Sequence, residues 1–233
     1  MNSNRIARHY SGPEGEQYFA YQSAANSARQ RLEIWKFERY IKPTDTVVDF
    51  GCGSGLLLKF LDAATKLGIE INPAARSYAD RHGINTVSSV NEITDEFADV
   101  VISNHALEHT IRPLDELEDI RRILKPDGRL VIYLPFDDWR MHRRFHIDVD
   151  EPNHHLYTWS PLLLRNLLIE AGYTVHDSRL VRFTWPPFAL QLSRLGRSIF
   201  LGLGALASFV RQSRQVVAVA SPAKDPTHSL GRP

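Results

Sequence analysis

The sequence lacks several features that mark specialised classes of protein. Cys52 is the only cysteine among 233 residues, so no intrachain disulfide can form and a disulfide-stapled secreted module is excluded. Lysine and arginine number 28 and aspartate and glutamate 27, which excludes nucleic-acid binding driven mainly by phosphate neutralisation. With 43% hydrophobic and 24% charged residues, the composition predicts one ordinary globular core.

Long apolar stretches are also lacking. The first residues hold no run of the roughly 7 to 15 apolar residues that a signal peptide needs. The most apolar stretch, 199–210, is shorter than the roughly 20 residues that cross a bilayer, and Gly202 and Gly204 interrupt it. We therefore expect a cytoplasmic protein that could associate with a membrane surface but does not span the bilayer.

The clearest pattern that is present is alternation. Short, nearly continuous apolar runs alternate with helical patterns, which favours an α/β fold whose parallel sheet is covered by helices. Helices are expected over 14–41, after Pro113, and from Pro161 to Gly172, where Ser160 is the expected N-cap. The expected strands are 46–50, 67–71, 86–89, 98–103, 129–134, 173–181 and 215–220.

The same pattern divides the chain into segments. Residues 1–43 are expected to form an N-terminal helical lid or cap, and residues 44–220 the main domain. The main domain is interrupted by an apolar insertion at 184–213, too long for a hairpin loop and expected to hold one or two helices. The proline-containing end, 221–233, is expected to be disordered.

The most informative segment is a glycine turn. The strand expected at 46–50 runs into Gly51-Cys52-Gly53-Ser54-Gly55, and a helix is expected from Leu56. Glycines at such a turn let the backbone approach a ligand closely, which predicts a cofactor site. The dinucleotide fingerprint G-x-G-x-x-G requires glycine where Leu56 stands, so the match to NAD binding is incomplete.

The segment Val47-Val48-Asp49-Phe50-Gly51-Cys52-Gly53-Ser54-Gly55 resembles motif I of the class I S-adenosylmethionine-dependent methyltransferases. Segments 67–73, 100–109 and 124–132 resemble, in order, the family's second strand, its fourth strand with the following turn, and its fifth strand. The resemblance implies a Rossmann-like, doubly wound, seven-stranded, mostly parallel sheet with an antiparallel last strand. It also implies S-adenosyl-L-methionine as cofactor.

Carried over to this sequence, the resemblance implies a set of cofactor-binding residues. Glu70 would accept hydrogen bonds from the ribose hydroxyls, although its spacing from Gly51 also suits NAD. The acid that often meets adenine in the family is missing here, and Asn91 or a backbone contact is expected to replace it. The expected set is Asp49, Gly51, Gly53, Gly55, Glu70, Asn91, Asn104 and His105.

Candidate catalytic groups follow the expected fourth and fifth strands, where ligands bind in open α/β sheets. They are His105, His154, His155 and Tyr157, as proton acceptors or acceptor-orienting groups, or else as groups that only cap and pack. Between them lie Arg140, Arg143 and Arg144, which could meet an acceptor phosphate or carboxylate. No metal is expected, because the rival ligand set lacks a tight zinc spacing; that set is His142, His146, Asp148, His154 and His155.

These features predict a methyltransferase that acts on oxygen or nitrogen of a small polar, saccharide or lipid-linked acceptor. Two alternatives remain at this point: a non-catalytic interaction protein with the same fold, and an NAD-dependent oxidoreductase. The expected partner is a small-molecule acceptor and no nucleic acid. The apolar segment 185–210 could in addition contact a membrane surface or another protein.

Overall fold

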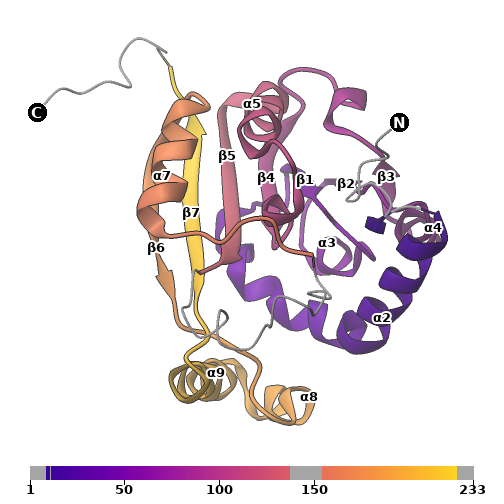
Figure 1. Cartoon of the computed structure of the whole chain (residues 1–233), viewed down its shortest axis with the longest axis vertical. Helices are drawn as coiled ribbons and strands as arrows, with labels where there is room; N and C mark the ends of the chain where they lie inside the picture. The colour runs from indigo at the N-terminus through magenta and orange to yellow at the C-terminus, as the bar shows by residue number, and fades with distance from the viewer. Residues whose placement is uncertain (1–8, 11, 137–153, 225–233) are drawn as a thin grey trace, which may run out of the picture.

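The computed structural model describes residues 9–10, 12–136 and 154–224. Within them, one sheet runs in the order β3-β2-β1-β4-β5-β7-β6 (Figure 1). β1 to β5 pair in parallel and β7 is antiparallel to both neighbours, which confirms the expected fold class. The strands are β1 (Thr46–Phe50), β2 (Thr65–Ile69), β3 (Asn85–Val87), β4 (Ala98–Asn104), β5 (Leu124–Pro135), β6 (Tyr173–Val181) and β7 (Gln215–Pro222).

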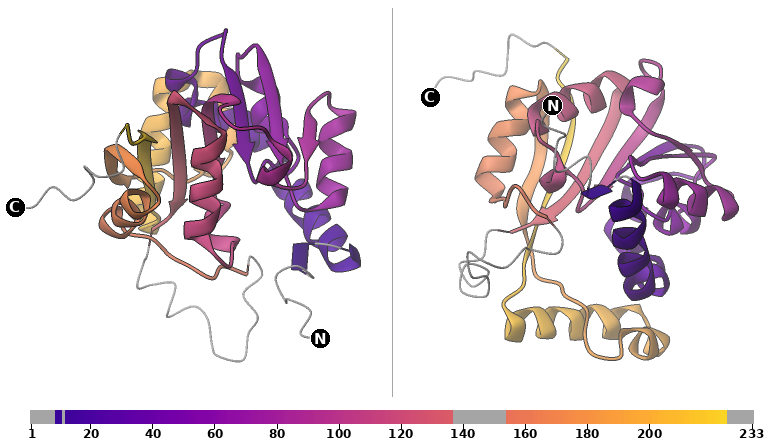
Figure 2. Two further views of the ribbon diagram at one scale, coloured as in Figure 1. Left: turned by 90° about the horizontal axis from the view of Figure 1, so that it is seen from above. Right: turned by 45° about the vertical axis from the view of Figure 1, so that its right-hand side comes forward.

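Helices connect the strands and cover both faces of the sheet (Figure 2). The α-helices are α2 (Gly12–Gln30), α3 (Leu56–Phe60), α4 (Pro73–Arg81), α5 (Pro113–Ile123), α7 (Pro161–Glu170), α8 (Ala189–Leu192) and α9 (Arg197–Arg211). Short 3-10 helices are η1 (Arg31–Lys36), η2 (Glu38–Tyr40), η3 (Val90–Glu92), η4 (Leu107–His109) and η5 (Ser193–Leu195). None of the described helices is long and apolar enough to cross a membrane.

The core is built from alternate side chains of the central strands. Val48 and Val101 point to the face that α5 and α7 cover, and their neighbours Val47 and Val100 point to the face covered by α3 and α4. All four are buried. Because successive side chains of a strand point to opposite faces, a strand buried on both faces is apolar at most positions. This requirement accounts for the nearly continuous apolar runs in the sequence.

All seven expected strands are present, although only two of them have the expected bounds at both ends. β1 and β6 have the expected bounds, whereas β2 lies two residues earlier than 67–71 and ends at Ile69. β7 continues through Ser221 and Pro222, which pair with Thr174 and Tyr173 of β6. The disordered tail expected from residue 221 was therefore placed too early, because Ser221 and Pro222 still pair with β6.

The prediction of one helix over 14–41 is wrong. α2 ends at Gln30, and the chain continues as η1 and η2. The periodic apolar pattern missed a buried polar contact, because Lys36 is only 1% exposed. Its Nζ lies 2.5 Å from Oε2 of Glu33 and donates a hydrogen bond of 2.9 Å to Oδ1 of Asn104, at the end of β4.

Asn104 completes this triad by donating from Nδ2 to Oε2 of Glu33 at 2.9 Å. Nζ of Lys36 also lies 5.0 Å from the ring centre of Tyr133. Each charged group is thus compensated at short range, as buried charges require. The triad fixes the segment that follows α2 to the carboxyl end of β4.

Lys36→Met should lower the free energy of unfolding by about 3–5 kcal/mol, because Glu33 is left as an uncompensated buried charge. The double variant Glu33→Leu/Lys36→Met should recover most of that loss, since it removes both charges. Urea unfolding followed by circular dichroism measures both. Lys59→Met, at an exposed position of α3, is the matched control and should change stability by less than about 0.5 kcal/mol. Equal stability of the Lys36 variant and the unaltered chain would contradict this account.

Candidate functional site

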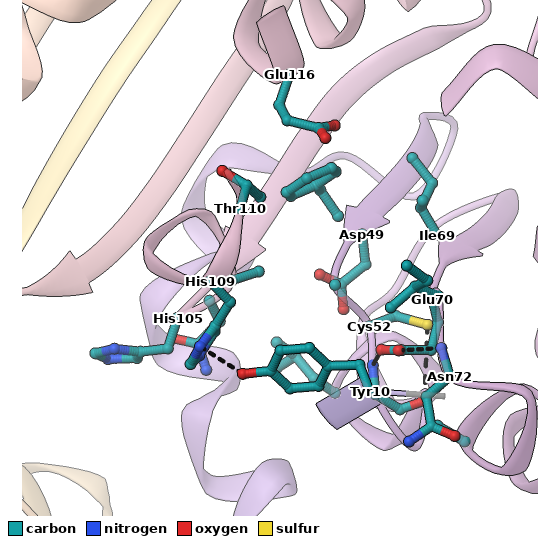
Figure 3. A pocket seen from close by; sticks show the side chains of 18 of the residues that line it. Tyr10, Asp49, Cys52, Ile69, Glu70, Asn72, His105, His109, Thr110 and Glu116 are labelled. Atoms are coloured by element: carbon teal, nitrogen blue, oxygen red, sulfur yellow. Dashed lines mark hydrogen bonds between the residues drawn. The ribbon is translucent and has the colours of Figure 1, made fainter. Parts of the chain in front are cut away.

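A cavity of about 810 Å³ opens at the carboxyl ends of β1, β2 and β4 (Figure 3). Its volume lies within the roughly 300–1,000 Å³ typical of ligand sites. Open parallel sheets bind ligands at this edge, beside the point where the strand order reverses, which here lies between β1 and β4. The walls come from the turn after β1, the end of β2, the turn after β4 and the N-terminal segment.

The turn after β1 uses glycine at three positions with left-handed backbone. Gly51, Gly53 and Gly55 have φ angles of +75°, +54° and +70°, which strain other residues. A Cβ on Gly51 would overlap Cβ of Ala106, and one on Gly55 would lie 3.0 Å from Cβ of Ala79. A Cβ on Gly53 would meet no atom within 4 Å, so the backbone at Gly53 borders the open cavity.

The amide hydrogens of this turn are already bonded within the protein. Gly51 and Cys52 donate to the main-chain oxygen of Ile69 at 2.9 and 3.0 Å. Gly53 donates to Oε2 of Glu70 at 2.9 Å. Sites for a pyrophosphate depend on amides that are free to donate to the phosphate. Three amides of this turn are therefore not available to such a ligand.

Glu70 follows β2 directly and its carboxylate lies at the cavity (Figure 3). While Oε2 bonds to Gly53, Oε1 accepts from the amide of Asn72 at 2.8 Å. Burial raises the pKa of Glu70, although these two amides oppose the rise. Each carboxylate oxygen accepts more than one hydrogen bond. Glu70 can thus hold the turn in place and still accept from two neighbouring hydroxyls of a ligand.

Asp49 adds a second carboxylate to the same wall. Its side chain projects from β1, is 2% exposed, and borders the cavity. Its Oδ1 has no hydrogen-bond donor among the residues that the structure describes. Burial, and next the charge of Glu70, raise the pKa of Asp49 well above its usual range. A buried acceptor without a donor is costly, so a cation or a donor in the cavity would stabilise this group.

Cys52 occupies the middle of the turn and is 5% exposed. A Cβ on Gly68 of β2 would overlap its sulfur, so the thiol packs directly against that strand. Burial, and next the charges of Asp49 and Glu70, raise the pKa of the thiol well above its usual range. The group is therefore a packing residue and not a nucleophile.

The opposite wall follows β4 and centres on a buried carboxylate. Glu108 is 0% exposed, and within the described ranges neither of its oxygens has a hydrogen-bond partner. Nδ1 of His105 lies 3.3 Å from Oε1. Burial alone would raise the pKa of Glu108, but His105 and His109 bring it below its usual value. Glu108 is thus ionised beside an imidazole that borders the cavity.

His109 and His155 lie next to this pair. The Tyr10 hydroxyl and Nδ1 of His109 form a hydrogen bond of 2.7 Å, and the His109 and His155 ring centres are 4.9 Å apart. Burial lowers the pKa of His109 to about 4, so its imidazole is neutral at neutral pH. Glu108, His109 and His155 each place one potential metal-ligand atom within 4.8 Å of the other two. This set differs from the one that the sequence indicated.

The cavity brings together seven of the residues expected from the sequence: Asp49, Gly51, Gly53, Glu70, Asn104, His105 and His155. It does not bring in Gly55, Asn91, His154 or Tyr157. Residues 142, 146 and 148 of the rival metal set, and Arg140, Arg143 and Arg144, lie outside the described residues.

Each residue left out of the cavity has another contact. Gly55 packs against α4. Asn91 is exposed in η3, and its main-chain amide donates a hydrogen bond to the hydroxyl of Ser89, the N-cap of η3. Ser89 itself borders the cavity. His154 stacks on His9 with ring centres 5.1 Å apart. Tyr157 donates from its hydroxyl to the main-chain oxygen of Ile111 at 3.0 Å.

Sequence reasoning assigned no role to several cavity residues. Glu108 carries a usable signal, because an acid between two histidines directly after a buried strand indicates a site. Glu33 carries none, since its periodic context is that of a surface helix. Trp185 lies in the insertion between β6 and β7, and no local pattern places it at the cavity.

The donor and acceptor groups of the cavity fit S-adenosylmethionine, the cofactor that the resemblance implies. That molecule has a positive sulfur and an ammonium group, which suit the carboxylates of Asp49 and Glu70. It also has a ribose with two neighbouring hydroxyls, which suits the acceptor capacity of Glu70. A side chain at Gly53 would extend into open space at the cavity, so glycine there leaves room for a ligand.

Comparison with known proteins points to the same group. A family model described as a methyltransferase domain matches residues 16–178. The chain is 38% identical over 99 residues to the ribosomal protein L11 methyltransferase of Photobacterium profundum, covering 37% of this chain and 32% of that protein. The chain therefore spans about a third of the length of the curated relatives it matches.

Solved structures share the fold. An S-adenosylmethionine-dependent methyltransferase from Archaeoglobus fulgidus superposes with a TM-score of 0.63 at 18% identity, over 87% of this chain and 98% of that one. Phosphoethanolamine N-methyltransferase 2 of Haemonchus contortus, in complex with phosphomonomethylethanolamine and S-adenosylhomocysteine, gives 0.60 at 15% identity, over 94% and 59%. Since the family model matches well over half of its residues, the chain belongs to the class I S-adenosylmethionine-dependent methyltransferase family.

Proposed function

We propose that this chain transfers the methyl group of S-adenosylmethionine to an oxygen or nitrogen atom of a small polar acceptor. The observation that carries the proposal is the wall beside the glycine turn, where the carboxylates of Asp49 and Glu70 face the cavity while three amides of the turn are bonded internally. Such a wall favours a cationic, hydroxyl-bearing ligand over the pyrophosphate of NAD.

The cofactor would be held at three places along the cavity. Glu70 would accept from the ribose hydroxyls, and Asp49 and Asn104 would face the methionine end. Ser89, which borders the cavity, would lie beside the adenine. When bound, S-adenosylmethionine supplies a methyl group on a positive sulfur that is already activated for transfer. The protein's part is therefore mainly to align the acceptor and to remove its proton.

His105 is the proposed proton acceptor. Its Nδ1 lies 3.3 Å from Oε1 of the ionised Glu108, and its Nε2 would accept a proton from a hydroxyl or ammonium in the cavity. The backbone of His105 has a φ angle of +58°, and its amide is fixed by a 2.8 Å hydrogen bond to Tyr133 O. Such a strained backbone persists where surrounding contacts fix it, and it favours a functional position.

The N-terminal segment is proposed to close the cofactor end of the cavity. Tyr10, Tyr18 and Phe19 border the cavity from this segment, and the triad around Lys36 fixes its far end to β4. Covering the site would exclude water while the methyl group is transferred.

The acceptor is proposed to be a small polar, saccharide or lipid-linked molecule. Beyond His105, the wall offers hydrogen-bonding groups on Thr110, Arg112 and Glu116 and an apolar surface on Trp185. The curated relatives are named for a protein acceptor, ribosomal protein L11, which is the competing class.

Incubating the chain with labelled cofactor and a cell extract, then separating small molecules from protein, decides between a small-molecule and a protein acceptor. Cofactor binding without label transfer would support a non-catalytic role.

Gly53→Val should weaken binding of S-adenosylhomocysteine by about a hundredfold or more, because the side chain fills the space of the ligand. Gly83→Val is the matched control. Gly83 also has a positive φ, and a Cβ placed on it would meet no atom within 4 Å, but it lies away from the cavity. Titration calorimetry measures both. If both variants lost the same affinity, the loss would come from backbone strain, and the assignment of Gly53 to the cofactor site would be wrong.

Glu70→Ala should weaken S-adenosylhomocysteine binding by about 1–3 kcal/mol, because the ribose hydroxyls lose their acceptor and the turn loses its bond to Gly53. Glu118→Ala, on the exposed side of α5, should leave the affinity unchanged. Binding of NAD should be undetectable for both variants and for the unaltered chain. An unchanged dissociation constant for Glu70→Ala would exclude its proposed role.

His105→Gln should lower kcat by about 10²–10⁴ on the acceptor identified by labelling, with a much smaller change in cofactor affinity. Glu108→Gln should also lower kcat, by less than His105→Gln, because a neutral amide replaces the carboxylate that lies 3.3 Å from the His105 imidazole. The control is His176→Gln, which changes an exposed histidine of β6.

Turnover should survive dialysis against EDTA. If EDTA abolishes turnover and a divalent cation restores it, Glu108, His109 and His155 would instead be metal ligands.

A further inference from the structure

The chain between β6 and the end of β7 has an unusual charge distribution. Residues 178–223 contain six arginines and no aspartate or glutamate, although the whole chain is nearly neutral. Within the described part of the chain, only Arg179 and Arg197 of these arginines form ion pairs, with Asp177 and Glu38. Of the remaining four, Arg182, Arg194 and Arg211 are exposed and Arg214 is half-buried, so the segment carries a net positive charge toward solvent.

α9 is apolar on two faces. Its inner face, with Phe200, Gly204 and Ser208, is buried, and a Cβ on Gly204 would overlap the ring of Phe183. Its other face is also apolar but lies in solvent. We call this face, with the neighbouring exposed residues before it, the outer face: Phe188 (75% exposed), Leu195 (60%), Ile199 (51%), Leu206 (59%), Phe209 (68%) and Val210 (71%).

A helix that is apolar on opposite sides is not the surface helix of a free globular protein, which needs a polar stripe toward water. Exposed apolar patches of this kind mark surfaces that bind another apolar body. The exposed side of α9 carries arginine only at its ends, Arg197 and Arg211. Between these two arginines, the exposed side of α9 has no polar side chain larger than that of Ser198.

The topology places this segment at the edge of the sheet that carries the cavity. β6 runs parallel to β5, because both are antiparallel to β7, so the chain leaves β6 at the carboxyl edge. Figures 1 and 2 show α8 and α9 standing beyond that edge, apart from the sheet. Trp185 connects the two regions, since it borders the cavity and its ring centre lies 6.1 Å from that of Phe200.

We propose that the outer face docks onto the surface of a phospholipid bilayer that contains anionic lipids. The apolar side chains would enter the boundary between headgroups and acyl chains, and exposed arginines such as Arg194 would meet lipid phosphates. A second copy of the chain fits less well, because a two-fold contact through this face would bring arginines together with no acidic residue in the segment to pair with them.

The test is co-sedimentation of the purified full chain with vesicles. The chain should pellet with vesicles of phosphatidylcholine mixed with phosphatidylglycerol and much less with vesicles of phosphatidylcholine alone. Added salt should reduce the amount that pellets. Phe209→Ser should weaken vesicle binding about tenfold or more. Arg194→Gln should weaken it about fivefold, the effect of one charge near an anionic surface.

Leu162→Ser is the matched control, because Leu162 is an exposed leucine (64%) on a different helix, α7, and it should leave vesicle binding unchanged. Binding of S-adenosylhomocysteine should be unaltered in every variant, which shows that each is folded and separates this proposal from the assigned cofactor site. The proposal would be overturned if the chain pelleted with neither kind of vesicle. Equal losses of vesicle binding in Leu162→Ser and Phe209→Ser would also overturn it. So would a dimer in light scattering that Phe209→Ser dissociates.

Discussion

The tight turn between β1 and α3 is the constraint on which the rest of the site depends. The chain leaves β1 at Phe50 and enters α3 at Leu56 through three glycines with positive φ. The turn is bonded to the end of β2, through Ile69 and Glu70. Its shape is therefore fixed by the sheet itself and not by a ligand. Such preorganisation reduces the ordering cost of binding a ligand in the cavity.

Two strands could be placed to the residue from the sequence, for different reasons. β1 is an apolar run bounded by turn residues, and four of its five side chains are buried. β6 has one buried side chain of nine, but Gly172 marks where the preceding helix ends and the strand begins. The position of Glu70 could be anticipated for a related reason. A carboxylate directly after a buried strand of a parallel sheet has to lie at the carboxyl edge, among the ligand-facing groups.

Where prediction failed, a side-chain contact overrode the pattern in the sequence. Asn91 was expected at the adenine, but Ser89 begins a capping box that turns the chain and leaves Asn91 in solvent. Tyr157 is removed from the cavity by a bond to Ile111, 46 residues away. Lys36 lies in a helical pattern, but it buries its charge against Asn104, 68 residues away, and periodicity has no means of showing this. Loop and charged residues acquire their directions from tertiary partners that a single sequence does not reveal.

The sulfur enclosed in the glycine turn has a practical consequence. Because Cys52 is buried and its pKa is raised, the thiol stays protonated at neutral pH and reacts slowly with alkylating reagents. It is also the chain's only cysteine. A cysteine introduced at an exposed position would thus be the single accessible target for a fluorophore or a spin label. Distances between elements could be measured in solution without first removing any native residue.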